Sequence, residues 1–302
     1  PRNLAISTIT WFENTGTPRS RPQRETAMSP AMFRRGRELA AAVLAAVLAN
    51  LLLPAALPAA TVADPASPTI LVTGSNRGIG LGLVQEFAAK GWNVIATCRS
   101  PRDADELNAL ARANPKIRVE KLDVTSQRQI DALAGKYRGQ PIDVLFNNAA
   151  ILGEPAKQQI GDLDQELFEQ VMLANVYGPL KVSQAFVENV AASDQKKIIG
   201  MTSGLGSLTL MGRMSRFYYY QMSKAALNMG MRAMRNDLRE RGIIVALLAP
   251  GMVETGLLEE SGYQGKALST GESAAGLYGL VAALTIEDKG QPVNVDGKPI
   301  PW

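Results

Sequence analysis

Tyr220 and Lys224 have the residue types and the spacing of an acid–base pair. Residues four apart on a helix share one face, so a helix here would bring the phenol close to the ammonium group. A tyrosine with its ordinary pKa of about 10 exchanges protons poorly near neutral pH, but a neighbouring cation favours the phenolate and lowers that pKa. Tyr218 and Tyr219 compete for the role, yet only Tyr220 has the four-residue spacing to Lys224. The pair predicts a general acid–base, although solvated helix faces also carry pairs of this kind.

Two serines that precede this pair could hydrogen-bond a substrate oxygen. Ser203 ends an apolar run that reads as a strand, and ligands bind at the carboxyl ends of strands in parallel sheets. A hydroxyl there can stabilise charge that develops on the substrate oxygen. Ser207 is the rival, and either serine could instead cap a turn.

The stretch 70–81 has the pattern of a buried strand that enters a helix through a glycine-rich turn. Its glycines would permit a tight turn, a close approach of the backbone to a pyrophosphate, and close packing of the helix on the strand. The free N–H groups and positive dipole end of the helix would face the phosphates. The predicted nucleotide-binding residues of the turn are Gly74, Ser75, Asn76, Arg77, Gly78, Ile79 and Gly80.

Strand and helix patterns alternate along the rest of the chain, with no internal repeat. The predicted strands cover residues 70–73, 93–98, 117–122, 142–146, 197–201 and 243–248, and a last strand ends before Asp296. The predicted helices cover residues 79–90, 103–113, 127–137, 164–189, 218–241 and 272–284. This alternation predicts an α/β domain with a single doubly wound parallel sheet of the Rossmann type and helices on both faces.

The end of the second predicted strand indicates which dinucleotide would bind. An acidic residue there hydrogen-bonds a free ribose, whereas an arginine neutralises a 2′-phosphate. The strand ends in Cys98 and Arg99 with no acid, and Arg77 in the glycine turn adds a second positive charge. Either arginine alone could be a solvated surface residue, but the two together favour NADP(H) over NAD(H).

The composition excludes several kinds of chemistry. The 302 residues contain no histidine and one cysteine, which excludes a Ser-His-Asp triad, histidine-ligated zinc, a cysteine-rich metal site and an intramolecular disulfide. We therefore expect no metal. The net charge of +4 comes from residues 1–38, with seven Arg and three acidic residues, while the remaining 25 basic and 25 acidic residues balance. The neutral remainder predicts no nucleic-acid partner.

Residues 1–68 read as segments that precede the domain. Residues 1–27 lack a hydrophobic period and predict a disordered or untranslated leader. Residues 28–63 combine a basic start, an apolar run and small residues, which predicts a signal peptide or signal anchor, with membrane attachment through residues 34–60 or export to the periplasm. Without such a signal, a cytoplasmic location is expected. Residues 64–68 are then a linker, and residues 69–302 form the predicted NADP-binding domain.

Four motifs of this domain occur together, in order and at characteristic distances. They are TGSNRGIG at 73–80, NNAA at 147–150, YQMSK at 220–224 and PGMVET at 250–255. As a set they resemble the short-chain dehydrogenase/reductase family over about residues 68–302. Residues 218–228 and 295–302 resemble its subgroup of C-factor and sniffer-type carbonyl reductases. One departure is Ala150, where the family usually has glycine, which affects a local backbone contact and not the fold.

The resemblance implies roles for the site residues. Tyr220 would donate the proton in carbonyl reduction, and Lys224 would also reach the nicotinamide ribose. Asn175 would hold a water that relays protons to the lysine, and the alternative is a buried asparagine that only satisfies backbone groups. Ser203 is preferred to Ser207 because a Gly-Leu-Gly-Ser sequence completes the subgroup's motif after it. Asp123 and Val124 would contact the adenine, and Asn148 and Ala149 the adjacent ribose. The other cofactor contacts expected outside the glycine turn are Arg99, Tyr220, Lys224, Pro250, Gly251, Val253 and Thr255.

The resemblance also separates two reactions. Enoyl reductases of this family place their tyrosine seven residues before the lysine, and Phe217 occupies that position here, which favours a carbonyl reductase.

Residues 252–270 carry Leu257, Leu258 and Tyr263 among glycines, which predicts a short substrate lid over an open pocket.

We therefore expect an NADP(H)-dependent oxidoreductase that transfers a hydride between its cofactor and a small-molecule carbonyl or alcohol. The resemblance implies a homodimer or homotetramer. The alternative is a catalytically silent module with the same fold that senses or signals the state of the cofactor.

Overall fold

The computed structural model describes residues 64–212 and 216–302 of the chain. Their main feature is a seven-stranded sheet in the order β3-β2-β1-β4-β7-β8-β9, in which all neighbouring strands are parallel. The strands are β1 (Thr69–Thr73), β2 (Asn93–Cys98), β3 (Ile117–Lys121), β4 (Val144–Asn147), β7 (Lys197–Met201), β8 (Ile244–Ala249) and β9 (Val293–Asn294). The strand order changes direction between β1 and β4, which is the point where open α/β sheets bind ligands.

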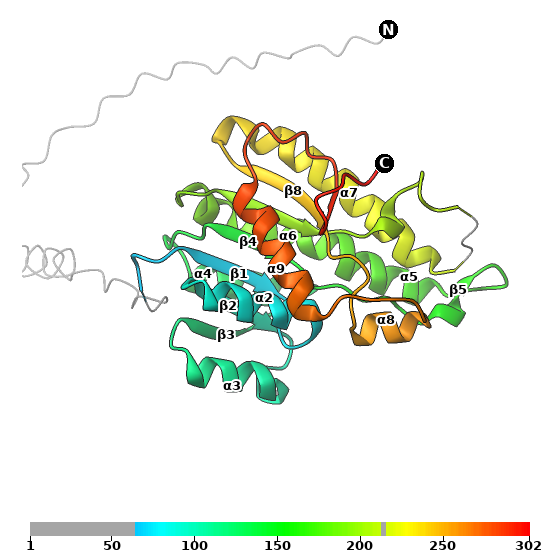
Figure 1. Ribbon diagram of the computed structural model, residues 1–302, viewed down its shortest axis with the longest axis horizontal. Helices are drawn as coiled ribbons and strands as arrows, with labels where there is room; N and C mark the ends of the chain where they lie inside the picture. The colour runs from blue at the N-terminus through cyan, green and yellow to red at the C-terminus, as the bar shows by residue number, and fades with distance from the viewer. Residues whose placement is uncertain (1–63, 213–215) are drawn as a thin grey trace, which may run out of the picture. The chain divides into compact units, whose positions relative to one another are not determined.

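Helices cover both faces of the sheet (Figure 1). Side chains of α2, α3 and α9 form a core on one face, and side chains of α4, α6 and α7 form a core on the other. The helices are α2 (Gly78–Ala89), α3 (Asp105–Ala113), α4 (Gln127–Lys136), α5 (Gln165–Met172), α6 (Gly178–Ala191), α7 (Tyr218–Leu238), α8 (Gly256–Ser261) and α9 (Thr270–Ala283). The prediction of a doubly wound parallel sheet is confirmed.

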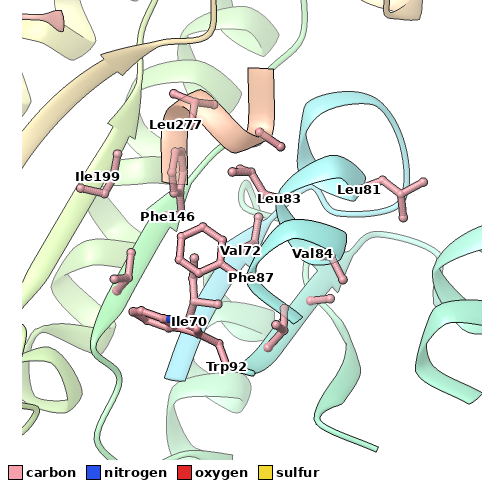
Figure 2. Packing of buried hydrophobic residues seen from close by; sticks show 14 of the residues in the cluster. Ile70, Val72, Leu81, Leu83, Val84, Phe87, Trp92, Phe146, Ile199 and Leu277 are labelled. Carbon is pink, nitrogen blue, oxygen red and sulfur yellow. The ribbon is translucent and has the colours of Figure 1, made fainter. Parts of the chain in front are cut away.

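Strand β1 sends alternate side chains to the two cores. Ile70 and Val72 pack with α2 and α9, whereas Leu71 packs on the opposite face, and all three are fully buried. Figure 2 shows the first of these cores, in which the rings of Phe87 and Trp92 meet edge to face with centroids 5.0 Å apart. Because the central strands are covered on both faces, their sequences are continuous apolar runs and not alternating ones.

The helix predicted over residues 164–189 contains a π-helical turn. Helix α5 passes into a π-helical turn, Leu173–Tyr177, before α6 begins. At the start of α6 the chain packs closely on the loop after β3, since a Cβ on Gly178 would lie 2.9 Å from the carbonyl oxygen of Val124. The wider turn leaves Asn175 fully buried. The chain is thus helical over the predicted range, and the π turn within it was not predicted because it keeps the apolar pattern helical and leaves no break in the sequence.

Three short elements, β5, β6 and α8, lie outside the predicted pattern. Strands β5 (Gln158–Gln159) and β6 (Asp162–Leu163) form an antiparallel pair between β4 and α5. Helix α8 lies within the segment predicted to be a lid. That segment is tied to itself because the N–H of Leu268 donates to the Met252 carbonyl at 2.8 Å, and the N–H of Glu254 donates back to the Leu268 carbonyl at 2.9 Å.

Residues 64–68, predicted as a linker, are held against the amino-terminal ends of β2 and β3. The carboxylate of Asp64 accepts hydrogen bonds from Ser67 at 2.7 Å and from Lys116 at 3.0 Å, which together lower its pKa to about 2. The side-chain amide of Asn93 donates to the Asp64 and Ser67 carbonyls at 2.6 and 3.0 Å. The segments predicted over residues 1–27 and 28–63 lie outside the described residues. Within 64–212 and 216–302, no helix has the length and apolar character needed to span a membrane.

Candidate active site

A cleft of about 1690 Å³ opens at the carboxyl ends of the central strands. Its walls come from the segments that follow β1, β2, β3, β4, β7 and β8 and from the first turns of α7. Every site residue predicted from the sequence lines this cleft except Ser75 and Asn175. A pocket for one small molecule occupies roughly 300–1,000 Å³, so the cleft has room for a dinucleotide together with a second molecule.

The glycine turn between β1 and α2 forms one end of the cleft and leaves space that side chains would fill. A Cβ on Gly74 would lie 2.9 Å from the Cα of Ala149. A Cβ on Gly80 would overlap the Gly74 carbonyl oxygen and lie 2.6 Å from the Asn148 amide nitrogen. Gly74 and Gly78 also have φ values of +68° and +56°, which side chains disfavour. The turn therefore depends on its glycines for both space and conformation.

We expect Gly80→Ala to lower the free energy of unfolding by about 1–3 kcal/mol or more, because the added methyl group must displace the main chain of Gly74. It should also weaken dinucleotide binding. Gly135→Ala is the matched control, since Gly135 lies in α4 with nothing within 4 Å of its Cβ position. There the change should stabilise the protein by about 0.5–1 kcal/mol. Urea unfolding measures both, and equal stabilities of the two variants would contradict the close packing at Gly80.

Polar side chains brace the glycine turn from behind. The Asn148 amide donates to the carbonyls of Thr73 and Gly74 at 2.8 and 3.0 Å, and the Thr73 hydroxyl accepts the N–H of Asn148 at 3.0 Å. The Ser75 hydroxyl is fully buried; it donates to the Val72 carbonyl at 2.8 Å and accepts the N–H of Thr97 at 3.2 Å. Ser75 therefore holds the turn against β2 and does not face the cleft.

The residues around the turn fit a phosphorylated dinucleotide. Arg77, the N-cap residue of α2, makes no side-chain hydrogen bond to the first turn of that helix, whose residues line the cleft. Those N–H groups are the donors that bind phosphate at helix N-termini. The cleft is also lined by Arg77 itself, by Arg99 after β2, and by Asp123 after β3. The Asp123 carboxylate is oriented by Thr125, whose N–H and hydroxyl donate to it at 2.9 and 2.7 Å.

Tyr220 is the one of the three consecutive tyrosines that lines the cleft. Its side chain is 7% exposed, and burial raises its pKa to about 12, while a hydrogen bond with Ser203 acts in the opposite direction. The Ser203 hydroxyl also accepts the N–H of Leu205 at 3.1 Å. Ser207 does not line the cleft, and its hydroxyl accepts the N–H of Leu210 at 3.1 Å. Tyr220 and Ser203 therefore share the lining of the cleft, whereas Ser207 lies in a turn outside it.

Lys224 lies beside the tyrosine ring, with its Nζ 5.5 Å from the ring centroid of Tyr220. The amine donates to the Met201 carbonyl at 2.8 Å, and burial lowers its pKa to about 8. The sequence predicts that the lysine lowers the pKa of Tyr220, whereas in this structure the tyrosine pKa lies above its ordinary value. The reason is that both groups are enclosed, so desolvation of each charged form outweighs their attraction.

Asn175 lies behind the cleft wall and joins three segments. Its side-chain oxygen accepts the N–H of Ile151 at 2.8 Å, and its amide donates to the Ile151 carbonyl at 2.8 Å and to the Ser223 hydroxyl at 3.0 Å. The Ser223 hydroxyl in turn donates to the Tyr220 carbonyl at 2.7 Å. Both amide protons of Asn175 are used in these bonds, so the side chain acts as a brace between the π turn, the loop after β4, and α7.

An apolar wall beside Tyr220 was not predicted from the sequence. Leu152 and Phe217 form a small buried cluster with Tyr220, and Leu205 and Leu257 pack against it. Leu257 was predicted as part of the lid, but Leu152 carried no signal because it lies in a loop without a regular pattern. Phe217 was considered only as the residue at the enoyl-reductase tyrosine position, and its packing against Tyr220 was not predicted. The wall would hold an apolar part of a substrate next to the tyrosine hydroxyl.

Thr255 lies between the glycine turn and the lid. Its hydroxyl donates to the Val253 carbonyl at 3.2 Å and accepts the N–H of Leu258 at 3.3 Å, which caps α8. A Cβ on Gly78 would lie 3.2 Å from its methyl group. Within 64–212 and 216–302, no group of three His, Cys, Asp or Glu side chains is placed to hold a metal ion.

This fold and this site define a class of protein: an oxidoreductase that binds a nicotinamide dinucleotide at the switch point of a doubly wound sheet. The family model of the short chain dehydrogenases matches residues 68–265. The chain therefore belongs to the short-chain dehydrogenase family and is an NAD(P)-dependent enzyme that acts on C=O or CH–OH groups.

Known relatives match this chain over nearly their full lengths. The NADPH-bound carbonyl reductase from chicken fatty liver is 32% identical with a TM-score of 0.72, and 78% of this chain and 99% of that chain are covered. The carbonyl reductase Sniffer of D. melanogaster is 28% identical with a TM-score of 0.70, and 78% of this chain and 100% of that chain are covered. A 1-hydroxy-2-glutathionyl-2-methyl-3-butene dehydrogenase of Rhodococcus sp. (strain AD45) is 32% identical over 239 residues, which cover 78% of this chain and 99% of that protein. The resemblance seen in the sequence motifs is confirmed.

Proposed function

We propose that the protein is an NADP(H)-dependent carbonyl reductase in which Tyr220 is the proton donor. One observation carries the proposal. Tyr220 is only 7% exposed, its ring centroid lies 5.5 Å from the Lys224 Nζ, and it lines the same cleft as Ser203 and the glycine turn. A proton donor and a nucleotide cradle in one enclosed space are the two parts that reduction of a carbonyl group requires.

The chain's own residues would act on the substrate oxygen. When bound, the nicotinamide cofactor supplies the hydride. Tyr220 gives its hydroxyl proton to the carbonyl oxygen, and Ser203 hydrogen-bonds the same oxygen and stabilises the charge that develops there. Lys224, in its charged form, stabilises the phenolate that remains and hydrogen-bonds the ribose of the cofactor. The apolar wall around Leu152 excludes water from the reacting groups.

The site residues would hold the cofactor in a fixed order along the cleft. The glycine turn and the first turn of α2 take the pyrophosphate, and Arg77 and Arg99 take the 2′-phosphate. Lys224 and the segment from Pro250 to Thr255 would contact the nicotinamide end of the cofactor. The relative from chicken fatty liver was crystallised with NADPH, which supports this choice of cofactor.

We expect NADPH to bind at least about tenfold more tightly than NADH, a difference of ~1.4 kcal/mol. The two arginines can neutralise a 2′-phosphate, and no acidic residue follows β2 to hydrogen-bond a free ribose. Arg99→Asp should remove the preference. Fluorescence titration of both nucleotides measures it, with Arg102→Ala as the control, since Arg102 lies outside the cleft lining. Equal affinities of the unmodified enzyme for the two nucleotides would contradict the assignment.

The experiment that tests the reaction mixes the purified enzyme with NADPH and a panel of aldehydes, ketones and quinones. Oxidation of NADPH that depends on one of these carbonyl compounds supports the proposal. Tight NADPH binding without oxidation by any of them would favour the alternative of a cofactor sensor. The buried Tyr220 and Lys224, which line the cleft together with Ser203, favour the enzyme, because a sensor has no use for an enclosed proton donor.

Two further parts of the proposal rest on sequence patterns. The basic start and apolar run within residues 28–63 support export or membrane attachment, and if they do not act as a signal the enzyme would be cytoplasmic. Membership of the family supports a homodimer or homotetramer.

A further inference from the structure

The first turn of α7, which carries Tyr220, has no cap from its own N-terminal residue. Phe217, the N-cap residue, is in the left-handed region with φ 63° and ψ 41°, and its side chain makes no capping hydrogen bond. The N–H groups of the first helical turn need an acceptor, because unpaired buried donors cost stability. An acceptor comes instead from a distant part of the chain.

Gln158 supplies that acceptor. Its side-chain oxygen accepts the N–H of Tyr219 at 3.1 Å and the N–H of Tyr220 at 3.3 Å. Gln158 lies in β5, 62 residues before Tyr220, and is fully buried. The short pair of β5 and β6 thus brings one amide to the start of the helix that holds the proton donor, next to α5 and α7 (Figure 1).

The nitrogen of the same Gln158 amide holds the loop after β4, which carries Leu152 of the apolar wall. This nitrogen donates to the Leu152 carbonyl at 3.0 Å and to the Glu154 carbonyl at 3.4 Å. Between them lies Gly153, with φ +79°, where a Cβ would come within 3.1 Å of the Gln158 nitrogen. The loop is therefore shaped to admit this side chain. Leu152, which the amide holds, also packs in the apolar cluster with Tyr220.

We propose that Gln158 is a positioning residue, which fixes Tyr220 relative to the apolar wall through the backbone of both. The inference rests on the proposed function, because it requires Tyr220 to be the proton donor. Gln158 does not line the cleft and acts only through the segments it joins. Proton transfer depends on hydrogen-bond distances between donor and acceptor, so a small shift of Tyr220 or of the substrate wall slows the reaction.

The test compares two substitutions of Gln158. Gln158→Met keeps the length of the side chain but removes the acceptor and both donors. We expect kcat for carbonyl reduction to fall about 10- to 100-fold while the NADPH dissociation constant stays within about twofold, since a misplacement near 1 Å can cost about 10²-fold. Amide exchange at Tyr219 and Tyr220 should become at least about tenfold faster.

Gln158→Glu adds a readout that packing alone would not give. The carboxylate form still accepts the two N–H groups but faces the Leu152 and Glu154 carbonyls with no proton to donate. The protonated form restores one donor, so the activity of this variant relative to wild type should rise as the pH falls through the pKa of the introduced carboxyl group. Burial among carbonyls should place that pKa above the ordinary value of about 4.3. The methionine variant should show no such recovery.

Asn189→Leu is the matched control for lost stability. The Asn189 amide is also buried and donates to two main-chain carbonyls, Tyr137 at 2.6 Å and Gln140 at 2.8 Å, but it lies in α6 and outside the cleft lining. The Asn189→Leu substitution should lower the melting temperature and leave kcat and amide exchange at Tyr219 and Tyr220 unchanged. If Gln158→Met behaves like this control, the positioning role is wrong while the proposed function stands. If wild type oxidises no NADPH with any carbonyl compound, or if Tyr220→Phe stays active, the proposed function fails and the inference falls with it.

Discussion

Tyr220→Phe is expected to lose nearly all carbonyl reduction while keeping its fold and its affinity for NADPH. Phenylalanine preserves the ring that packs with Leu152 and Phe217 and removes only the hydroxyl. A positioned general acid contributes about 10²–10⁴-fold to the rate, so kcat should fall by that factor. Steady-state kinetics and fluorescence titration of NADPH measure the two effects separately.

Tyr219→Phe is the control for this substitution. Tyr219 is also buried, but its ring meets Phe168 with centroids 5.4 Å apart and does not line the cleft. It should keep most of its activity. Near-full activity of Tyr220→Phe together with loss of activity in Tyr219→Phe would show that the catalytic tyrosine has been assigned to the wrong residue.

Lys224→Met is expected to weaken both catalysis and cofactor binding. The ammonium group would stabilise the phenolate of Tyr220 and hydrogen-bond the cofactor ribose. A hydrogen bond to a charged group contributes about 1.5–3 kcal/mol, so NADPH affinity should fall about 10- to 100-fold. We expect kcat to fall about 10²-fold or more. An unchanged NADPH affinity would contradict the contact with the ribose.

The same substitution should have the opposite effect on the stability of the cofactor-free protein. Burial lowers the folded-state pKa of Lys224 to about 8 from its ordinary 10.5. Below pH 8 both states bind the proton, and the cost of burying the charge is fully present. Between pH 8 and 10.5 the unfolded chain binds more protons than the folded one, so wild-type stability rises with pH. Lys224→Met should therefore gain stability over wild type at pH 7, and the gain should shrink as the pH rises through this window.

Lys197→Met is the control for the lysine. Lys197 is a second buried lysine whose amine donates to a main-chain carbonyl, that of Val281 at 2.7 Å, and burial also lowers its pKa. It begins β7 and so lies at the end of the sheet opposite the cleft. Its replacement should change thermal stability with pH in the same direction and leave kcat and NADPH affinity unaltered. A stability difference for Lys224→Met that does not vary with pH would contradict the lowered pKa.

The sheet could be predicted from the sequence because its strands are local apolar runs separated by helical periods. The position of the site followed, since Gly74, Ser203 and Tyr220 come directly after strands or at a helix start. The spacing of Tyr220 and Lys224 gave their proximity, because that spacing is fixed by helix geometry.

Burial and long-range contacts could not be predicted in the same way. The pKa of Tyr220 depends on how completely the cleft encloses it, and a spacing along a helix does not contain that information. Asn175 was predicted to hold a water that relays protons to the lysine, but its partners at Ile151 and Ser223 could not be predicted, because they depend on a π turn that leaves the apolar pattern intact. Gln158 was not predicted at all, because its importance comes entirely from contacts with residues 219 and 220.

The hydrogen bonds that hold residues 64–68 against the start of β2 have a practical consequence for handling the enzyme. They place Asp64 at the amino-terminal ends of the strands, whereas the cleft opens at the carboxyl-terminal ends. A group attached directly at residue 64 would therefore start on the side of the sheet away from the cleft. A surface, a carrier protein or an affinity tag attached there would leave the cleft open to substrate and cofactor, so this end is the suitable one for immobilisation.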